Sequence, residues 1–311
     1  MILELVNEVK NRLKGAQNPL VAVLGPTASG KTKLSLVLAK ELDAEIISAD
    51  SRQLYKGLEI GADALPIQEQ AGIPHHLLSF LEPNAFYTLV DYMRDAGRII
   101  SDIYNRGKTP MMVGGTGLYM SSISEGYQLH KVAPDFEFRY KLQNEYEQFG
   151  IEYLYEKLKK IDPEAASKIH PNNVRYVIRA LEINHQTQAN KKNAKQKSPY
   201  TTVQIGLEWP RDILYDRINT RVDKQIARGL VEEVKALLPY VKTSSPAYSS
   251  LGFKEIAEYI NGNKTLEEAI ELVKKNTRNY AKRQLTWFRK NKDIIWLDGE
   301  SVEKELAQYQ L

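Results

Sequence analysis

The chain has 311 residues, of which 42% are hydrophobic and 26% are charged, and its formal net charge is +4. This composition is typical of a globular protein with one large or two ordinary domains, and so small an excess of charge says nothing about nucleic acid unless the basic residues cluster. The absence of cysteine excludes a disulfide framework and a thiolate zinc site.

The first fifteen residues have apolar positions at helical spacing, which predicts a helix. Glu4 and Glu8 interrupt them, which argues against a signal peptide. No apolar run approaches the roughly 18 residues that a membrane span needs. We therefore expect no membrane association, the cytoplasm as compartment, and a monomer.

Short apolar segments then alternate with longer amphipathic ones. Strands are predicted at 20–25, 44–50, 75–80 and 110–115, and helical spacing marks segments such as 88–107. This alternation favours a parallel sheet covered by helices on both faces.

The pattern changes after Ser124. Residues 135–182 are helical in pattern, and the polar, lysine-containing segment 184–200 predicts a loop. Strands are predicted again at 201–209 and 293–298, with two long helical patterns between them. The simplest organisation is an α/β core of residues 1–125 and 200–311, interrupted by a helical insertion of residues 126–199.

The segment GPTASGKT lies between the first strand and the next helical pattern, and it matches the phosphate-loop motif G-x-x-x-x-G-K-[ST]. In that context backbone N–H groups and a helix N-terminus face an anion, while a chance glycine-rich turn is the alternative. Lys31 would neutralise phosphate charge, and Thr32 could ligate Mg²⁺. The predicted phosphate-binding residues are Gly25, Pro26, Thr27, Ala28, Ser29, Gly30, Lys31 and Thr32.

Two further residues fall where strands end. Asp50 follows the second strand, and at that sheet edge it could hold Mg²⁺ through water, act as a general base, or only cap a helix. The strand at 110–115 leads into Gly114-Gly115-Thr116-Gly117, where a phosphate-loop NTPase often has an aspartate. The missing aspartate weakens the interpretation as an ordinary ATPase without excluding a kinase. Thr116 either offers a hydroxyl at this sheet edge or belongs to a tight turn with no role in binding.

Basic residues recur at helical spacing in two segments near the chain end, and a shorter pair lies in the insertion. One such stripe is usually a solvated face, whereas two favour a polyanionic partner or a second phosphate-binding face. Tyr280 and Trp287 are interleaved with the second stripe. The residues are Arg217, Arg221, Lys224 and Arg228; Arg278, Lys282, Arg283 and Arg289; and Arg175 and Arg179.

Taken together, these segments resemble the tRNA dimethylallyltransferase (tRNA isopentenyltransferase) family, bacterial type. The matching stretches run in order from residue 25 to residue 290, so the resemblance covers nearly the whole chain. They are GPTASGKT, ISADSRQLYKGLEIGADAL, PHHLL, VGGTGLY, IHPNNVRYVIRALE, RINTRVDKQIARGLVEEV, LGFKEI and YAKRQLTWFRK.

The resemblance implies a phosphate-loop α/β core like that of a nucleotide kinase, with a helical insertion that grips the anticodon stem-loop of tRNA. It implies that dimethylallyl diphosphate donates its dimethylallyl group to N6 of the adenosine at position 37, next to the anticodon, in tRNAs that read codons starting with U. Diphosphate is released. The loop would thus hold an isoprenoid diphosphate, with Mg²⁺, and not a triphosphate to be split.

The resemblance also implies roles for single residues. Asp50 would take the N6 proton, Thr116 would contact the reactive adenosine and isoprenoid, and Arg221 would lie at the diphosphate. The residues implied to contact tRNA are Asp50, Ser51, Arg52, Gln53, Thr116, Arg139, Arg175, Tyr176, Val177, Ile178, Arg179, Lys282, Arg283, Gln284, Trp287 and Arg289.

Three other functions stay open at this point. A small-molecule kinase would leave the basic stripes without a role. An isopentenyltransferase acting on free adenine nucleotides would not need the insertion. An RNA-binding module without activity would not need the phosphate loop and Asp50.

Overall fold

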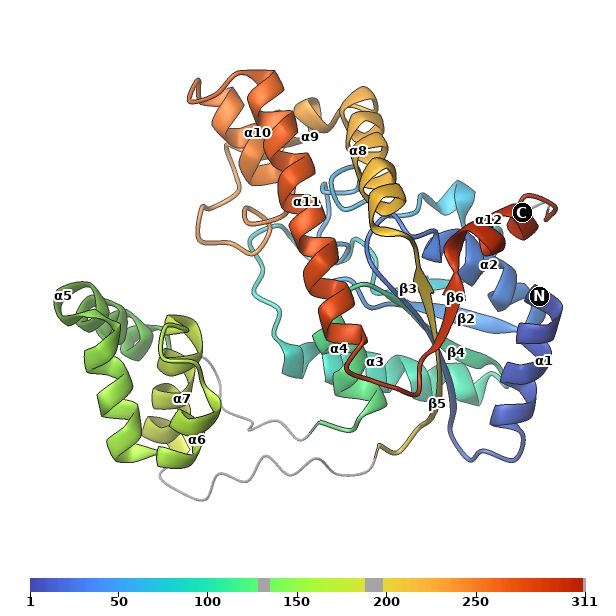
Figure 1. Ribbon diagram of the computed structural model, residues 1–311, viewed down its shortest axis with the longest axis horizontal. Coiled ribbons are helices and arrows are strands. Elements are labelled where there is room, and N and C mark those ends of the chain that lie inside the picture. Colours follow the sequence, from blue (N-terminus) through green and yellow to red (C-terminus); the bar gives the residue numbers. More distant parts are fainter. Residues whose placement is uncertain (128–134, 188–197, 310–311) are drawn as a thin grey trace. The chain divides into compact units, whose positions relative to one another are not determined.

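The computed structural model describes residues 1–127, 135–187 and 198–309 (Figure 1). The chain forms two compact units, of which the first, here called the α/β core, comprises Met1–Gly126 and Lys197–Leu311. The second, here called the helical unit, is Tyr127–Gln196. The boundaries expected from the sequence lay between residues 125 and 126 and between residues 199 and 200.

The α/β core is built on one parallel sheet of six strands, in the order β3-β2-β4-β1-β5-β6 (Figure 1). The strands are β1 Pro19–Leu24, β2 Ala44–Ser48, β3 His75–His76, β4 Thr109–Gly114, β5 Thr201–Glu208 and β6 Ile295–Asp298. β1 lies between β4 and β5, so the loop that follows β1 emerges near the middle of the sheet edge. The predicted parallel α/β sheet is confirmed.

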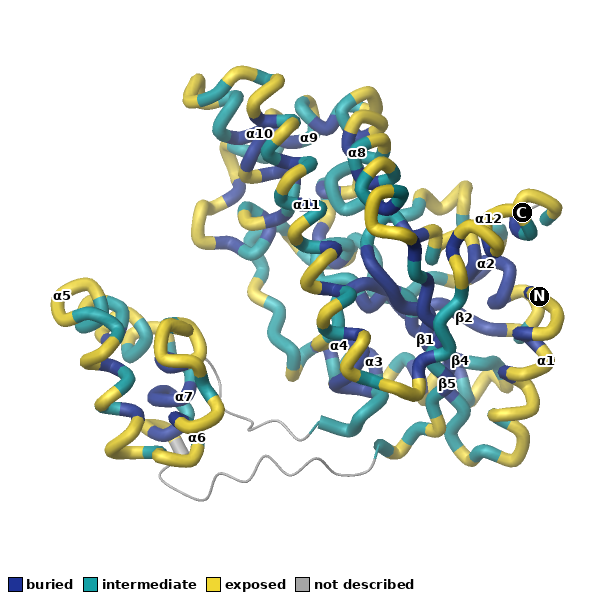
Figure 2. Tube along the Cα trace, in the orientation of Figure 1, coloured by how far each residue is buried: buried dark blue, intermediate teal, exposed yellow. Residues whose placement is uncertain are grey.

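Helices cover both faces of this sheet. Leu20, Ala22 and Leu24 of β1 belong to one hydrophobic cluster and Val21 and Val23 to another, which is the alternation of a strand buried on both sides (Figure 2). One face packs against α1 Ile2–Leu13, α2 Lys31–Glu41 and α12 Gly299–Leu306. The hydrophobic cluster on the other face is completed by residues of α3 Leu89–Asn105, α4 Gly117–Ser124 and α11 Leu266–Phe288, and it continues into α9 Leu230–Leu237 and α10 Phe253–Ile260.

Two helices bring basic residues to the carboxyl edge of the sheet. α8 Arg211–Ala227 packs against α11 around a small cluster that contains Trp209, Ile218 and Ala281. Thr265 begins α11 with a capping box, because its hydroxyl accepts from the Glu268 N–H while the Glu268 carboxylate accepts from the Thr265 N–H. The two stripes noted in the sequence therefore lie on neighbouring helices.

The strand predicted over residues 75–80 was wrong beyond its first two residues. β3 ends at His76, since Leu77 and Ser79 adopt φ angles of 58° and 43°, which do not belong to a strand. The connection between β2 and β3 contains a short 3₁₀ helix, Ile67–Glu69. None of the described helices is long and apolar enough to cross a membrane.

The helical unit consists of α5 Phe136–Ile161, α6 Pro163–Lys168 and α7 Val174–Thr187. α5 is interrupted at Gly150, whose φ of 82° only glycine adopts readily, and the two halves fold back on α7 around Leu142, Leu154 and Leu158. The loop predicted over 184–200 begins later than expected, because α7 continues to Thr187. Its residues 188–197 lie outside the described part of the chain.

Candidate functional site

The phosphate-loop motif forms a tight loop between β1 and the N-terminus of α2. Three of its residues have φ angles in the left-handed range: Gly25 (143°), Ala28 (62°) and Gly30 (92°). A Cβ on Gly25 would lie 2.9 Å from the Leu207 carbonyl oxygen, so the glycine is required by close backbone approach. The Lys31 Nζ donates a 2.6 Å hydrogen bond to the Pro26 carbonyl and thereby closes the loop over itself. This is the arrangement that presents backbone N–H groups to an anion.

Side chains from distant parts of the chain support this loop from outside. The Arg217 guanidinium donates to the Ala28 carbonyl at 3.0 Å, and the Trp209 indole donates to the Ser29 carbonyl at 3.0 Å. Arg217 also stacks on Trp209, 4.0 Å from the ring centroid. Arg217, predicted only as part of a basic stripe, therefore helps to fix the loop's backbone.

A pocket of about 290 Å³ opens at the carboxyl edge of the sheet beside the loop. It combines cations, carboxylates and an aromatic side chain from β2, α8, α11 and their adjoining loops. The side chains that line it include Lys31, Thr32, Asp50, Ser51, Arg52, Gln53, Asp63, Arg221, Tyr280, Arg283 and Gln284. The structure thus gathers most of the predicted core residues in one place.

Asp50 and Thr116 lie at the ends of the neighbouring strands β2 and β4. Asp50 lines the pocket and accepts a 2.9 Å hydrogen bond from the Arg52 backbone N–H. The Thr116 hydroxyl oxygen accepts from the Ser51 N–H at 3.0 Å, which ties the two strand ends together. The Thr116 hydroxyl is therefore fixed to the residue that follows Asp50 in the chain.

The charges in the pocket are coupled. Burial, and then the positive charge of Arg221, lower the pKa of Lys31 to about 8, against the opposing influence of Asp50 and Asp63. Burial raises the pKa of Tyr280 to about 12, with Asp50 adding to it, so this hydroxyl stays protonated at neutral pH. The Thr116 hydroxyl lies within hydrogen-bonding reach of Tyr280.

The glycines after β4 explain why that segment carries no bulky residue. A Cβ on Gly115 would overlap the Gln284 amide, and one on Gly117 would overlap the Trp287 indole. Gln284 is buried, where it accepts from the Thr27 N–H and donates to the Gly115 carbonyl, each at 2.9 Å. Its side chain thus joins the phosphate loop to the segment after β4, which the sequence did not indicate. Gln284 also lines the pocket, and its contact with tRNA stays a prediction.

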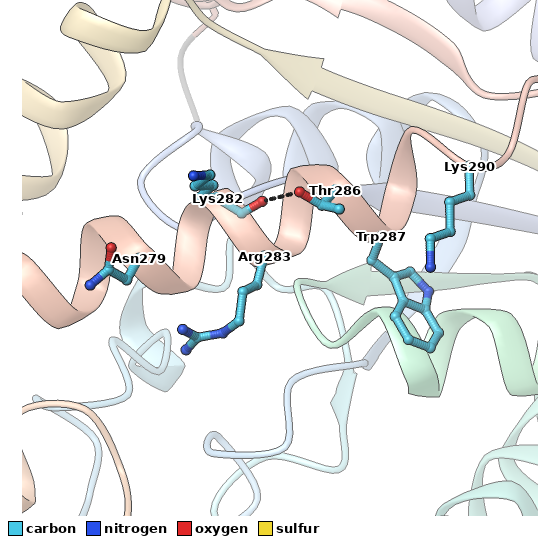
Figure 3. Close-up of a pocket in the computed structure, with 6 residues that line it drawn as sticks. All are labelled: Asn279, Lys282, Arg283, Thr286, Trp287 and Lys290. Atoms are coloured by element: carbon cyan, nitrogen blue, oxygen red, sulfur yellow. Dashed lines mark hydrogen bonds between the residues drawn. The ribbon is translucent and has the colours of Figure 1, made fainter. Parts of the chain in front are cut away.

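Basic side chains project from the last turns of α11 and from the segment just after it, and these are here called the basic face of α11 (Figure 3). Lys282, Arg283 and Lys290 are exposed, and with Trp287 they border a hollow of about 380 Å³. The Trp287 indole donates to the Ser121 hydroxyl at 3.2 Å, and the Lys290 amine lies 5.4 Å from its ring centroid. Basic groups around an aromatic ring are what a nucleic-acid backbone and an unstacked base can use.

Several other residues of the two basic stripes form hydrogen bonds or ion pairs with side chains of the α/β core itself. Arg278 donates to the Asn219 side chain at 2.6 Å, and Arg289 pairs with Glu208 at 3.3 Å. On α8, Lys224 is exposed, whereas Arg228 pairs with Asp63 at 3.0 Å. A repeated basic spacing in a sequence thus does not distinguish a supporting residue from one that faces a ligand.

In the helical unit a buried carboxylate gathers arginines. Glu182 has no exposed surface, and its oxygens accept from Arg139 at 2.8 and 2.9 Å and from Arg179. Burial alone would raise the pKa of Glu182, but these arginine hydrogen bonds outweigh it and lower the pKa. The two guanidinium groups are thereby held in fixed positions.

Both arginines border a hollow of about 850 Å³ on the helical unit, together with Arg175 and the exposed ring of Tyr140. Of the other residues predicted to contact tRNA here, Tyr176 is exposed and Ile178 lies at the bottom of the hollow. Val177 is wholly buried in the unit's core, so its side chain does not line the hollow, and its contact with tRNA stays a prediction.

Sequence reasoning did not identify Asp63 as part of the site. Its carboxylate lines the pocket and pairs with Arg221 at 3.5 Å and with Arg228 at 3.0 Å. The sequence carries no signal for it, because the pairing joins a turn after β2 to a helix far along the chain.

Comparison with known families agrees with this geometry. The family model described as IPP transferase matches residues 53–291, and the model described as isopentenyl transferase matches residues 18–72. The chain is 46% identical to the tRNA dimethylallyltransferase of Bacillus subtilis, over 96% of this chain and 97% of that one. It is 44% identical to the enzyme of that name from Halalkalibacterium halodurans, over 91% and 92%.

Solved structures give the same result. The tRNA isopentenylpyrophosphate transferase of Bacillus halodurans matches with a TM-score of 0.70 and 42% identity, over 94% of this chain and 95% of that one. A eukaryotic dimethylallyltransferase acting on tRNA matches with a TM-score of 0.77 and 29% identity, over 93% and 75%. The expected phosphate-loop fold is thus confirmed, and the chain belongs to the tRNA dimethylallyltransferase (IPP transferase) family.

Proposed function

We propose that the protein transfers the dimethylallyl group of dimethylallyl diphosphate to N6 of adenosine 37, beside the anticodon, in tRNAs that read codons starting with U. The products are N6-(dimethylallyl)adenosine and diphosphate. The observation that carries this proposal is the meeting of a phosphate loop, Asp50 and Thr116 at one sheet edge in a member of this family.

The donor's diphosphate would lie in the loop. There, backbone N–H groups, Lys31 and Arg221 would stabilise the negative charge that builds up as the carbon–oxygen bond of the donor breaks. Thr32 and Asp50 both line this pocket, and their oxygens are of the kind that Mg²⁺ prefers. A magnesium ion held by Thr32 and the diphosphate would supply further positive charge to the leaving group.

The acceptor would approach from the Asp50 side. N6 forms a bond to the allylic carbon and must lose a proton, which Asp50, a residue that lines the pocket, would accept. Thr116, fixed by the Ser51 N–H and close to Tyr280, would orient the amino group. The adenosine has to leave its stack in the anticodon loop to reach this pocket.

The tRNA would be held by the basic face of α11 and by the arginine-lined hollow of the helical unit. Lys282 and Arg283 on α11 and Lys290 just after it supply charge there, and Arg175 and Arg179 supply it on the helical unit. Phosphate contacts of this kind set the position of a nucleic acid without reading its sequence. A kinase or an enzyme acting on free adenine nucleotides would have no use for these two surfaces.

The test is an acceptor panel with dimethylallyl diphosphate labelled in its carbon chain. The protein is incubated with unmodified tRNA, with AMP and with ATP in separate reactions, and with Asp50→Asn as the control for uncatalysed transfer. Label in tRNA alone supports the proposal. Label in AMP or ATP would favour the free-nucleotide enzyme, and ATP turnover without labelled product would favour a kinase.

A further inference from the structure

Resting on the diphosphate site proposed above, we infer that Asp63 is a built-in counter-ion that competes with the diphosphate for Arg221 and so limits how tightly donor and product bind. The pocket that would hold the diphosphate contains Lys31 and Arg221, and Asp63 is the carboxylate paired with Arg221 within it. An anion entering the pocket must take over this arginine from Asp63.

The position of Asp63 is strongly determined. It ends a turn over residues 60–63, here called the 60–63 turn, whose backbone is held by side chains from three other segments. Glu233 accepts from the Ile60 and Gly61 N–H groups at 2.7 and 2.8 Å. Gln225 donates to the carbonyls of the same two residues at 2.8 and 3.0 Å.

The third segment is the one that follows Asp50. The Gln53 amide donates to the Asp63 carbonyl at 3.2 Å, and its oxygen accepts from the buried Ser48 hydroxyl at 3.0 Å. Asp63 itself has a φ of 50°, a conformation that aspartate and asparagine tolerate better than most residues. This turn keeps the backbone of Asp63 beside the pocket, because moving it would break hydrogen bonds on three sides. The 3.0 Å pairing with Arg228 holds the carboxylate there when an anion takes Arg221.

The chemical consequence concerns both ends of the reaction. A negative charge facing a bound diphosphate weakens its binding through like-charge repulsion, and the loss of the Arg221 pairing adds to that cost. The donor and the released diphosphate use the same site, so the same repulsion speeds the departure of the product. The released diphosphate is the part of the donor that the pocket binds, so its departure is a step that can limit turnover.

The direct test is the binding of inorganic pyrophosphate to the complete protein, followed by calorimetry, for wild type and Asp63→Asn. Asparagine keeps the shape and tolerates the backbone angle. The matched control is Asp43→Asn, because Asp43 has a φ of 45°, pairs with Lys108 at 2.8 Å and lies on the turn between α2 and β2. Each titration is done with Mg²⁺ and again with a chelator.

We expect Asp63→Asn to bind pyrophosphate about tenfold more tightly than wild type in both conditions, with Asp43→Asn unchanged. Stronger inhibition of transfer by added pyrophosphate should accompany it. Equal or weaker binding by Asp63→Asn would overturn the inference, and weaker binding only with Mg²⁺ would instead assign Asp63 to holding the metal. If wild type binds no pyrophosphate at all, the proposed diphosphate site itself is wrong.

Discussion

The backbone N–H of Thr27 donates a 2.9 Å hydrogen bond to the side-chain oxygen of Gln284, a residue of α11. The side-chain NH₂ group of Gln284 donates to the Gly115 carbonyl. One buried side chain therefore links the phosphate loop, the segment after β4 and the helix with the exposed basic face. The loop's shape therefore depends on the docking of α11, and not on the motif alone.

Replacing Gln284 with Met should loosen the phosphate loop while keeping the volume of the side chain. Two buried hydrogen bonds are lost and the Thr27 N–H is left without this acceptor, at a cost of about 1–3 kcal/mol. We expect the KM for the donor to rise by about tenfold while tRNA affinity stays within about twofold. Steady-state kinetics with varied donor, beside direct tRNA binding, measure both.

The matched control is Gln70→Met. In the wild type the Gln70 amide donates to the Leu65 carbonyl, in the connection between β2 and β3. The control variant should leave the KM for the donor unchanged. A Gln284→Met variant that loses thermal stability but keeps its donor KM would reduce Gln284 to a purely structural residue.

Asp50→Ala should lower turnover by about 10²–10⁴-fold, the usual contribution of a positioned general base. Binding of tRNA should stay near the wild-type value, because the basic surfaces are untouched. Single-turnover rates at saturating donor and tRNA, with a parallel binding assay, separate the two quantities. Turnover near that of wild type would remove Asp50 from the chemistry.

Glu182→Gln should destabilise the helical unit by about 1–3 kcal/mol, because two arginines lose their buried negative partner and one accepting oxygen is replaced by an NH₂ donor. The pKa of Glu182 is lowered in the folded state, so its stabilising effect is complete above the ordinary carboxyl value of 4.5 and is lost as the pH falls through the lower folded value. Thermal unfolding at pH 7 and at pH 3 should therefore show a smaller difference between wild type and variant at the acidic pH. A difference that is constant with pH would contradict the ion-pair explanation.

Neutralising Arg175, Arg179, Lys282 and Lys290 together should weaken tRNA binding and flatten its salt dependence. Each phosphate contact that is lost lowers the slope of log affinity against log salt by about 0.7–0.9. A control variant neutralises Lys10, Lys14, Lys40 and Lys304, which are exposed on or next to the helices of the opposite sheet face and change the net charge equally. Equal slopes for the two variants would show that total charge, and not these two surfaces, governs binding.

How far the sequence could predict this structure depends on the range of the interactions. The strands at 20–25, 44–50 and 110–115 were predictable because strands buried on both faces are continuous apolar runs. The strand predicted at 75–80 was too long, because an apolar pattern does not reveal the left-handed backbone at Leu77 and Ser79.

The candidate site shows the same division. The phosphate loop is a local motif, and the rule that ligands bind at the carboxyl edge of a parallel sheet places Asp50 and Thr116 near it. The parts played by Asp63, Gln284 and Arg217 could not be predicted, since each depends on a contact with a residue far away in the sequence. Likewise Val177 follows Arg175 closely in sequence, yet faces the opposite side of α7.

The most direct measurement of the central claim follows both halves of the donor in one reaction. Dimethylallyl diphosphate is supplied with unmodified tRNA and no ATP, the released diphosphate is quantified, and the tRNA is digested and its nucleosides are identified by mass spectrometry. The account predicts equal amounts of diphosphate and of N6-(dimethylallyl)adenosine, located at position 37. Dimethylallyl adenosine that is absent from tRNA, or formation that requires the splitting of ATP, would contradict it.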